Sequence, residues 1–202
     1  MDLPFVTVLR PLGYPSPVIK PSDSLTPNSS SIFALYHNHT NVFVLMRKHA
    51  IPNLTVFSAE HAHYGGPQTL RNFKAYLEFP YQVSTMKLYE NLAAGVVMLI
   101  PTPRFLETLW KNRDHEILYH MWSLRRLPRR RLFRLQRPLH TARLGFPRWS
   151  AFMDYYAPEF APYIYYFDSW EELLALAALP AAELDSQGVS KGGGAFYEAE
   201  RG

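Results

Sequence analysis

Between residues 40 and 111, short apolar runs alternate with segments of helical character, and this alternation constrains the fold more than any other feature. Each run has about five residues and ends at a proline or a turn, which is typical of a strand. Strands that are apolar at every position are buried on both faces. The sequence therefore predicts an α/β fold, in which helices cover both faces of a parallel sheet.

The expected elements follow from capping residues and from the residues that end each run. Helices are expected from Thr40 or Asn41 to His49, from Ser84 or Thr85 to Ala94, and over Pro103–Lys111, with a helical turn at Gln68–Phe73. Strands are expected at Leu54–Ser58, Ala75–Phe79 and Val96–Ile100. This order predicts a Rossmann-like parallel sheet.

Further elements lie outside this region. Phe5–Arg10 is expected to form an N-terminal strand, Tyr163–Phe167 a closing strand and Trp170–Leu179 a closing helix. Half of the ten glycines fall in the tail, which is expected to be disordered. The predicted organisation is a core at 1–112, an Arg-rich helical insertion broken by prolines at 113–150, a closing strand and helix of the same domain at 151–185, and the tail at 186–202.

Composition excludes several classes of protein. The chain of 202 residues contains no cysteine, which excludes disulfides, thiolate catalysis and cysteine-bound zinc. Its longest apolar stretches reach about half of the roughly 18 residues that a membrane-spanning helix needs. The first residues lack the basic flank and apolar run of a secretory signal, so a cytoplasmic location is the default expectation. Nothing in the sequence fixes the compartment.

Two segments carry residues suited to an anion at the carboxyl ends of strands, residues 80–85 and Pro101–Thr102. Ligands of parallel α/β sheets bind there because helix N-termini present unpaired N–H groups. Ser84 and Thr85 add hydroxyl groups to the first segment. Glu90 follows in the same helix and could accept two hydrogen bonds from a ribose diol. The alternative is that Glu90 pairs with Lys87 on a solvated helix face.

Tyr-Gly-Gly-Pro at 64–67 and Tyr-Gln-Val-Ser-Thr-Met-Lys-Leu-Tyr-Glu-Asn-Leu-Ala-Ala-Gly-Val-Val-Met-Leu-Ile-Pro at 81–101 resemble the nucleotide-sugar half of GT-B glycosyltransferases. In that family, a loop leads into a helix that bears a Glu and ends at a small residue and Gly before a buried strand. The second Glu of the family's Glu-x7-Glu signature, the ribose ligand, corresponds to Glu90, and Gln82 stands at the first position. Residues 165–173 also resemble the last strand and helix of a poorly described eukaryotic branch of such proteins.

The resemblance implies a nucleoside-diphosphate sugar, such as a UDP-sugar, as donor substrate. It implies Arg10 and Lys20 as partners of the diphosphate, because family members often use an Arg and a Lys there; the alternative is ordinary surface charge. Gly65 and Gly66 lack a Cβ and would let the backbone approach a nucleobase or sugar, or they form a tight turn.

GT-B enzymes place the active site between two Rossmann-like halves, and the chain has room for only one. We therefore expect a C-terminal donor-binding half, either a fragment or a lone half, that needs an acceptor-binding N-terminal half in cis or in trans. No catalytic residue is assigned, and the isolated chain is expected to be inactive. His61 and His63 lack a third ligand, so no metal or other cofactor is expected. A sugar-nucleotide epimerase of similar fold is the other enzymatic alternative.

Residues 113–150 carry ten arginines against Asp114 and Glu116, a net charge of +8, whereas residues 151–202 carry −7. Five of the arginines are Arg125, Arg126, Arg129, Arg130 and Arg131. Such a block could pair with the acidic tail, bind an anionic membrane surface, or bind nucleic acid. The lack of an array of aromatic residues for base stacking argues against nucleic acid. A non-catalytic module that binds membrane or acidic protein is therefore the alternative function from another class.

Overall fold

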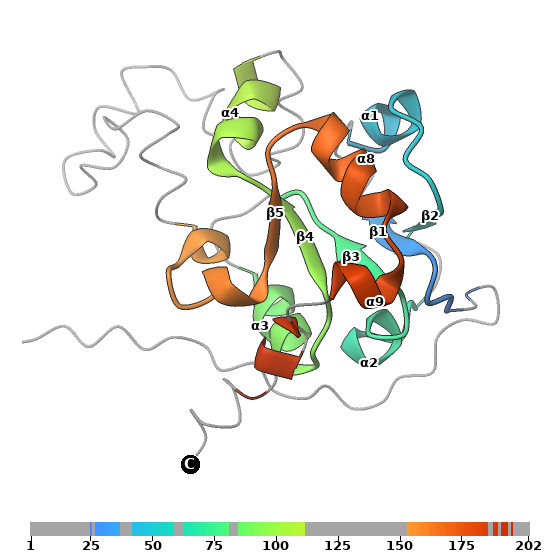
Figure 1. Cartoon of the computed structure of the whole chain (residues 1–202), viewed down its shortest axis with the longest axis vertical. Coiled ribbons are helices and arrows are strands. Elements are labelled where there is room, and N and C mark those ends of the chain that lie inside the picture. Colours follow the sequence, from blue (N-terminus) through green and yellow to red (C-terminus); the bar gives the residue numbers. More distant parts are fainter. Residues whose placement is uncertain are drawn as a thin grey trace, which may run out of the picture.

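The computed structural model describes residues 25, 27–36, 42–58, 63–80, 85–111, 153–185, 188–189, 191–193 and 195 (Figure 1). It shows a parallel sheet of β1 (Ile32–Tyr36), β2 (Leu54–Ser58), β3 (Ala75–Leu77), β4 (Met98–Pro101) and β5 (Tyr165–Phe167). The strand order is β2-β1-β3-β4-β5, and every neighbouring pair is parallel. The predicted α/β class with a Rossmann-like sheet is confirmed.

Helices alternate with these strands along the chain. They are α1 (Val42–Lys48), α2 (Pro67–Leu70), α3 (Met86–Ala93), α4 (Pro103–Lys111), α8 (Trp170–Ala178) and α9 (Ala181–Leu184), with 3-10 turns η3 (Asp154–Tyr156) and η4 (Ala161–Tyr163). The helices predicted between residues 40 and 111 are all present. Among the described residues, no helix has the length and hydrophobicity needed to cross a membrane.

The register of the strands places aromatic side chains on both faces of the sheet. Phe33 and Tyr76 are paired neighbours in β1 and β3, and Lys87 of α3 lies over the Tyr76 ring, 5.1 Å from its centroid. Side chains alternate along a strand, so Phe167 of β5 lies on the opposite face. There its ring neighbours include Phe105 of α4 at 5.8 Å, and Phe105 in turn meets Trp170 of α8 at 5.6 Å. Helices therefore cover both faces, as predicted.

Side-chain caps fix the beginnings of three helices. Thr85 accepts a hydrogen bond from the Leu88 N–H at the start of α3, and Ser169 accepts one from the Glu172 N–H at the start of α8. Thr102 accepts one from the Phe105 N–H at the start of α4, at 3.2 Å. At the start of α3 the cap is therefore Thr85 rather than Ser84, because the Thr85 hydroxyl reaches the third N–H of the helix.

The strand β1 was missed by the sequence analysis. It lies between β2 and β3 inside the sheet, and Ile32 and Phe33 are fully buried. The segment expected at the N-terminus, Phe5–Arg10, lies outside the described residues. Three other strands differ in their bounds from the prediction: β3 ends at Leu77 rather than Phe79, β4 begins at Met98 rather than Val96, and β5 begins at Tyr165 rather than Tyr163.

The tail also differs from the prediction of disorder where the structure describes it. Helical backbone is found at residue 189, at residues 191–193 and at residue 195. Val189 is 6% exposed, and a Cβ on Gly193 would lie 3.1 Å from the Leu92 carbonyl oxygen of α3. For these residues the prediction is wrong, because an apolar side chain and a close backbone approach hold them against the core.

Candidate functional site

The strand order locates the ligand crevice of the sheet. β2 pairs with one edge of β1, whereas β3 pairs with the opposite edge of β1. The direction in which strands are added to the sheet therefore reverses between β2 and β3. The order 2-1-3-4-5 is common among doubly wound sheets, and their ligands bind at the carboxyl ends of the strands that flank this reversal. Here those strands end at Tyr36 and Leu77. Pro80 and Thr85, the two described residues of the sequence-predicted segment 80–85, lie between the end of β3 and the start of α3, at this switch point.

Thr85 is the predicted site residue that the structure describes at this junction. Its hydroxyl caps α3 and lies 2.7 Å from the hydroxyl of Tyr155, which comes from η3. Thr85 is only 7% exposed. The hydroxyl already has two protein partners, so Thr85 can offer a ligand little beyond its position at the helix N-terminus.

Glu78, the residue directly after β3, was not singled out from the sequence. Its side chain is 3% exposed, and its Oε1 accepts a hydrogen bond from the Tyr155 hydroxyl at 3.1 Å and lies 3.5 Å from the Lys87 Nζ. Its Oε2 is buried and has no hydrogen-bond partner in the described structure. An acidic residue that ends an apolar strand, as in Ala-Tyr-Leu-Glu at 75–78, is the signal that could have found it.

The segment that supplies Tyr155 is held in place by two further tyrosines. The Tyr166 hydroxyl of β5 donates to the Tyr155 carbonyl at 2.6 Å, and the Tyr156 hydroxyl donates to the Pro101 carbonyl at 2.8 Å. Burial raises the pKa of both the Tyr156 and the Tyr166 hydroxyl, because the charged phenolate is poorly solvated there. Both groups therefore remain protonated donors at neutral pH.

Glu90 lies one helical turn beyond the start of α3. The buried residues of this helix are Leu88, Tyr89, Asn91 and Leu92, so Glu90 lies on the side turned away from the sheet, where it is half-buried. Lys87 forms an ion pair with Glu78, whereas the alternative interpretation paired Lys87 with Glu90. The structure therefore does not favour the pairing of Lys87 with Glu90.

The predicted glycine pair lies elsewhere. Gly65 and Gly66 have φ values of 85° and 72° and lead into α2, so the left-handed backbone conformation explains the glycines. A Cβ on Gly66 would meet no atom of the described residues within 4 Å. The neighbouring Tyr64 packs on Phe33 near the start of β1, with ring centroids 6.0 Å apart. Figure 1 shows α2 at the opposite end of the sheet from the start of α4. The structure thus separates the glycines from the carboxyl edge.

The remaining predicted residues lie outside the described part of the chain. They are Arg10, Lys20, Gln82, Ser84 and the arginines of 113–150. His61 is also outside it, and no group of three potential metal ligands occurs among the residues that the structure does describe.

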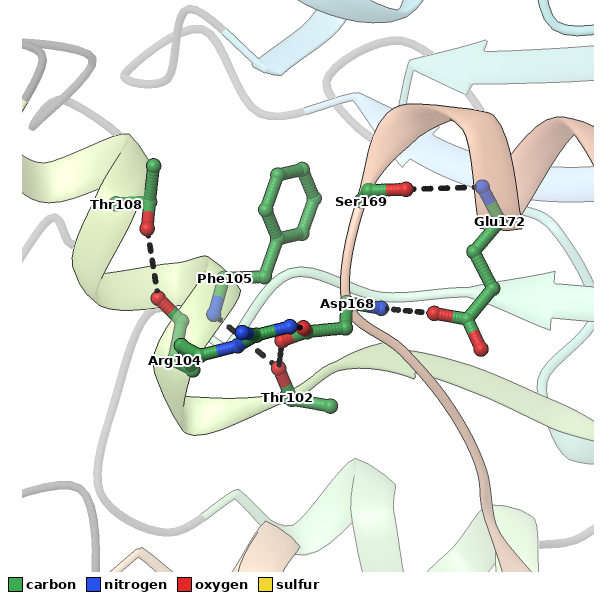
Figure 2. A network of polar contacts seen from close by, with 7 residues as sticks. All are labelled: Thr102, Arg104, Phe105, Thr108, Asp168, Ser169 and Glu172. Atoms are coloured by element: carbon green, nitrogen blue, oxygen red, sulfur yellow. Dashed lines mark hydrogen bonds and ion pairs between the residues drawn. The ribbon is translucent and has the colours of Figure 1, made fainter.

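A second junction joins the ends of β4 and β5 (Figure 2). Thr102 donates its hydroxyl hydrogen to the Asp168 carboxylate, and Arg104 forms an ion pair with the same carboxylate. The Thr102 N–H donates to the Phe167 carbonyl at 2.8 Å, which joins the two strand ends. The N-terminus of α4 therefore already faces a carboxylate of the chain itself. This corrects the expectation that Pro101–Thr102 offers an anion site, because Asp168 occupies the favourable end of the helix dipole.

Asp168 is held there by the start of α8. The Asp168 N–H donates to the Glu172 Oε2 at 2.6 Å, and the Glu172 N–H donates to the Ser169 Oγ at 3.1 Å (Figure 2). Reciprocal bonds of this kind, close to those of a capping box, fix the backbone before a helix. The Asp168 carboxylate is 19% exposed, whereas Arg104 is 83% exposed.

Comparisons with protein-family models, with curated proteins and with solved structures found no match to this chain. The resemblance to GT-B glycosyltransferases therefore stays a prediction.

Proposed function

We propose that the chain binds a nucleoside-diphosphate sugar at the carboxyl edge of its sheet, as the C-terminal, donor-binding half of a GT-B type glycosyltransferase. One observation carries this proposal: the switch point between β1 and β3 coincides with the entry into α3, the helix that bears Glu90. Ligands of open α/β sheets bind at such points. The sequence resemblance of residues 81–101 independently supports the same segment.

The electrostatics of the two junctions favour the α3 side for the diphosphate. At α3, the charge of Glu78 is balanced by Lys87, so the N-terminus of the helix keeps its favourable field for an anion. At α4, Asp168 already occupies the equivalent place. Arg10 and Lys20 remain the proposed basic partners of the phosphates, and Glu90 the proposed partner of the ribose diol.

Calorimetric titration of the folded chain with UDP and with GDP tests the proposal. We expect one of the two to bind with measurable heat and to raise the melting temperature. Glu90→Ala should lower the affinity about tenfold or more, because hydrogen bonds to a charged acceptor contribute about 1.5–3 kcal/mol each at most. Glu183→Ala removes an exposed carboxylate of α9 and is the matched control, expected to bind normally.

An unchanged dissociation constant in Glu90→Ala rejects Glu90 as the ribose ligand. Absence of heat and of a melting shift at millimolar nucleotide rejects nucleotide binding altogether. The sequence-based alternative, a module that uses the net charge of +8 in residues 113–150 to bind membranes or acidic proteins, would then be favoured.

Donor binding alone does not give glycosyl transfer. Positioning the acceptor against the donor contributes as much as about 7–11 kcal/mol to lowering the barrier, and in this proposal the facing half supplies it. We therefore expect purified residues 1–202 to show negligible transfer and donor hydrolysis.

A further inference from the structure

The Glu78 carboxylate is the most incompletely satisfied ionisable group at the switch point. Its side chain is only 3% exposed, yet among the residues that the structure describes only Oε1 finds partners. An ionised carboxylate accepts hydrogen bonds at both oxygens, and a buried oxygen without a partner costs free energy. Native proteins leave few such groups, and each calls for a physical explanation.

The surroundings of Glu78 fix which oxygen is left without a partner. The Tyr155 hydroxyl bonds to Oε1 and to the Thr85 hydroxyl, and Tyr155 itself is anchored by the Tyr166 hydroxyl. Lys87 also lies on the Oε1 side, at 3.5 Å. Because these partners all hold Oε1, the carboxylate cannot turn to satisfy Oε2 without losing them. The carboxylate is thus oriented by the protein before any ligand arrives.

We propose that Glu78 Oε2 accepts a hydrogen bond from a hydroxyl group of the ligand bound at the β1/β3 switch point. This inference rests on the proposed function and adds a recognition residue to it. A carboxylate is an acceptor only, so its ligand partner must be a donor, and a phosphate oxygen is repelled. Lys87 already balances the charge, so a neutral hydroxyl suits the position better than a second cation.

A nucleoside-diphosphate sugar carries such hydroxyls on both its ribose and its sugar. Oε2 is screened from solvent in the ligand-free chain, so the hydroxyl must displace the protein groups that cover this atom. A hydroxyl that replaces this cover supplies the missing hydrogen bond, whereas an apolar group does not. The chemistry shared by both sources is therefore an alcohol donor directed at one carboxylate oxygen.

The test is calorimetric titration of Glu78→Gln and of the unaltered chain with UDP and GDP, and with UDP-glucose or GDP-mannose for the base that binds. Gln keeps the shape but replaces one acceptor oxygen with a donor, so we expect affinity to fall about tenfold. An equal loss for nucleotide and nucleotide sugar assigns the ribose hydroxyl. A loss confined to the nucleotide sugar assigns a sugar hydroxyl.

Asp154→Asn is the matched control, because Asp154 also accepts a hydrogen bond from a tyrosine, Tyr89, next to this cluster. We expect it to leave every affinity unchanged. Glu78→Asp keeps the negative charge, but its shorter side chain moves the carboxylate oxygens away from the ligand. It serves as the test variant if Glu78→Gln does not fold. Thermal unfolding without ligand separates folding defects from binding defects.

The outcomes distinguish this inference from the proposed function. If the unaltered chain binds a nucleotide and Glu78→Gln and Glu78→Asp bind all ligands equally well, Glu78 is not a ligand contact and the proposed function stands. If the unaltered chain binds neither UDP nor GDP, both fail together.

Discussion

Asp168→Asn tests whether the contact between the starts of α4 and α8 stabilises the fold. In the structure the Asp168 carboxylate accepts the Thr102 hydroxyl, faces the N-terminus of α4 and pairs with Arg104. Asparagine has nearly the same shape, so the change removes the negative charge and leaves the packing in place.

The size of the effect follows from these three contacts. A hydrogen bond to a charged group contributes about 1.5–3 kcal/mol and a neutral one about 1 kcal/mol, so weakening the bond from Thr102 costs about 0.5–2 kcal/mol. Loss of the charge at the helix N-terminus costs about 0.3–1 kcal/mol more. Arg104 is 83% exposed, and solvent screening leaves its ion pair little net effect. The free energy of unfolding should therefore fall by about 1–3 kcal/mol.

Urea denaturation of both proteins, followed by circular dichroism, measures this difference. For a chain of this size, the melting temperature should also fall by about 2–4 °C per kcal/mol. Arg104→Ala is the control and should change stability by no more than a few tenths of a kcal/mol. If Asp168→Asn is as stable as Arg104→Ala, the carboxylate does not stabilise the start of α4, and the reasoning is refuted.

Three further predictions concern the same part of the fold. Tyr155→Phe removes one partner of the buried Glu78 carboxylate and should lower the free energy of unfolding by about 1–3 kcal/mol in urea denaturation. Gly95, at φ 71° after α3, is in the left-handed region, so Gly95→Ala should cost about 1–2 kcal/mol in the same assay with an unchanged denaturant slope. Tyr156 and Tyr166 have pKa values raised above the usual 10.0 by burial, so above pH 10 the unfolded chain loses protons that the folded chain keeps. Stability should then fall by up to about 1.4 kcal/mol per pH unit for each group, and Tyr166→Phe should remove its share of that slope.

The helix boundaries could be predicted because the interactions that set them are local. Thr85, Thr102 and Ser169 each accept a hydrogen bond from an N–H three residues further on, and such spacing is visible in the sequence. Gly95 likewise marks the end of α3 by its own backbone conformation. These helix boundaries can therefore be predicted without knowing the rest of the fold.

The strand β1 shows where this local analysis fails. Its five residues, Ile-Phe-Ala-Leu-Tyr at 32–36, are short and follow a serine-rich turn, so nothing in their period distinguishes them from a loop that carries apolar residues. Only pairing with β2 and β3 on its two sides makes the segment a buried strand. Residues far apart in sequence supply both partners.

The polar networks of the candidate site could not be predicted for the same reason. Glu78 meets Tyr155 across 77 positions, and Thr102 meets Asp168 across 66. The sequence predicted ligand segments at 80–85 and at Pro101–Thr102, but it could not show which side chains already occupy those strand ends. The class of fold was therefore predictable from the sequence. Which of the two junctions remains open to a ligand was not.

Asp168→Asn also tests where the diphosphate binds, because a carboxylate faces the start of α4 and Lys87 balances the carboxylate near the start of α3. Under the proposed function, the diphosphate lies near α3, away from the carboxylate that occupies the start of α4. Neutralising Asp168 should then leave nucleotide affinity nearly unchanged, because charges separated by more than about 8–10 Å are largely screened at physiological salt. A phosphate bound at the start of α4 would instead no longer be repelled by the Asp168 charge, and the variant would bind nucleotide more tightly. Titration of the variant with the nucleotide that the unaltered chain binds decides between the two positions, and tighter binding would place the diphosphate between β4 and β5.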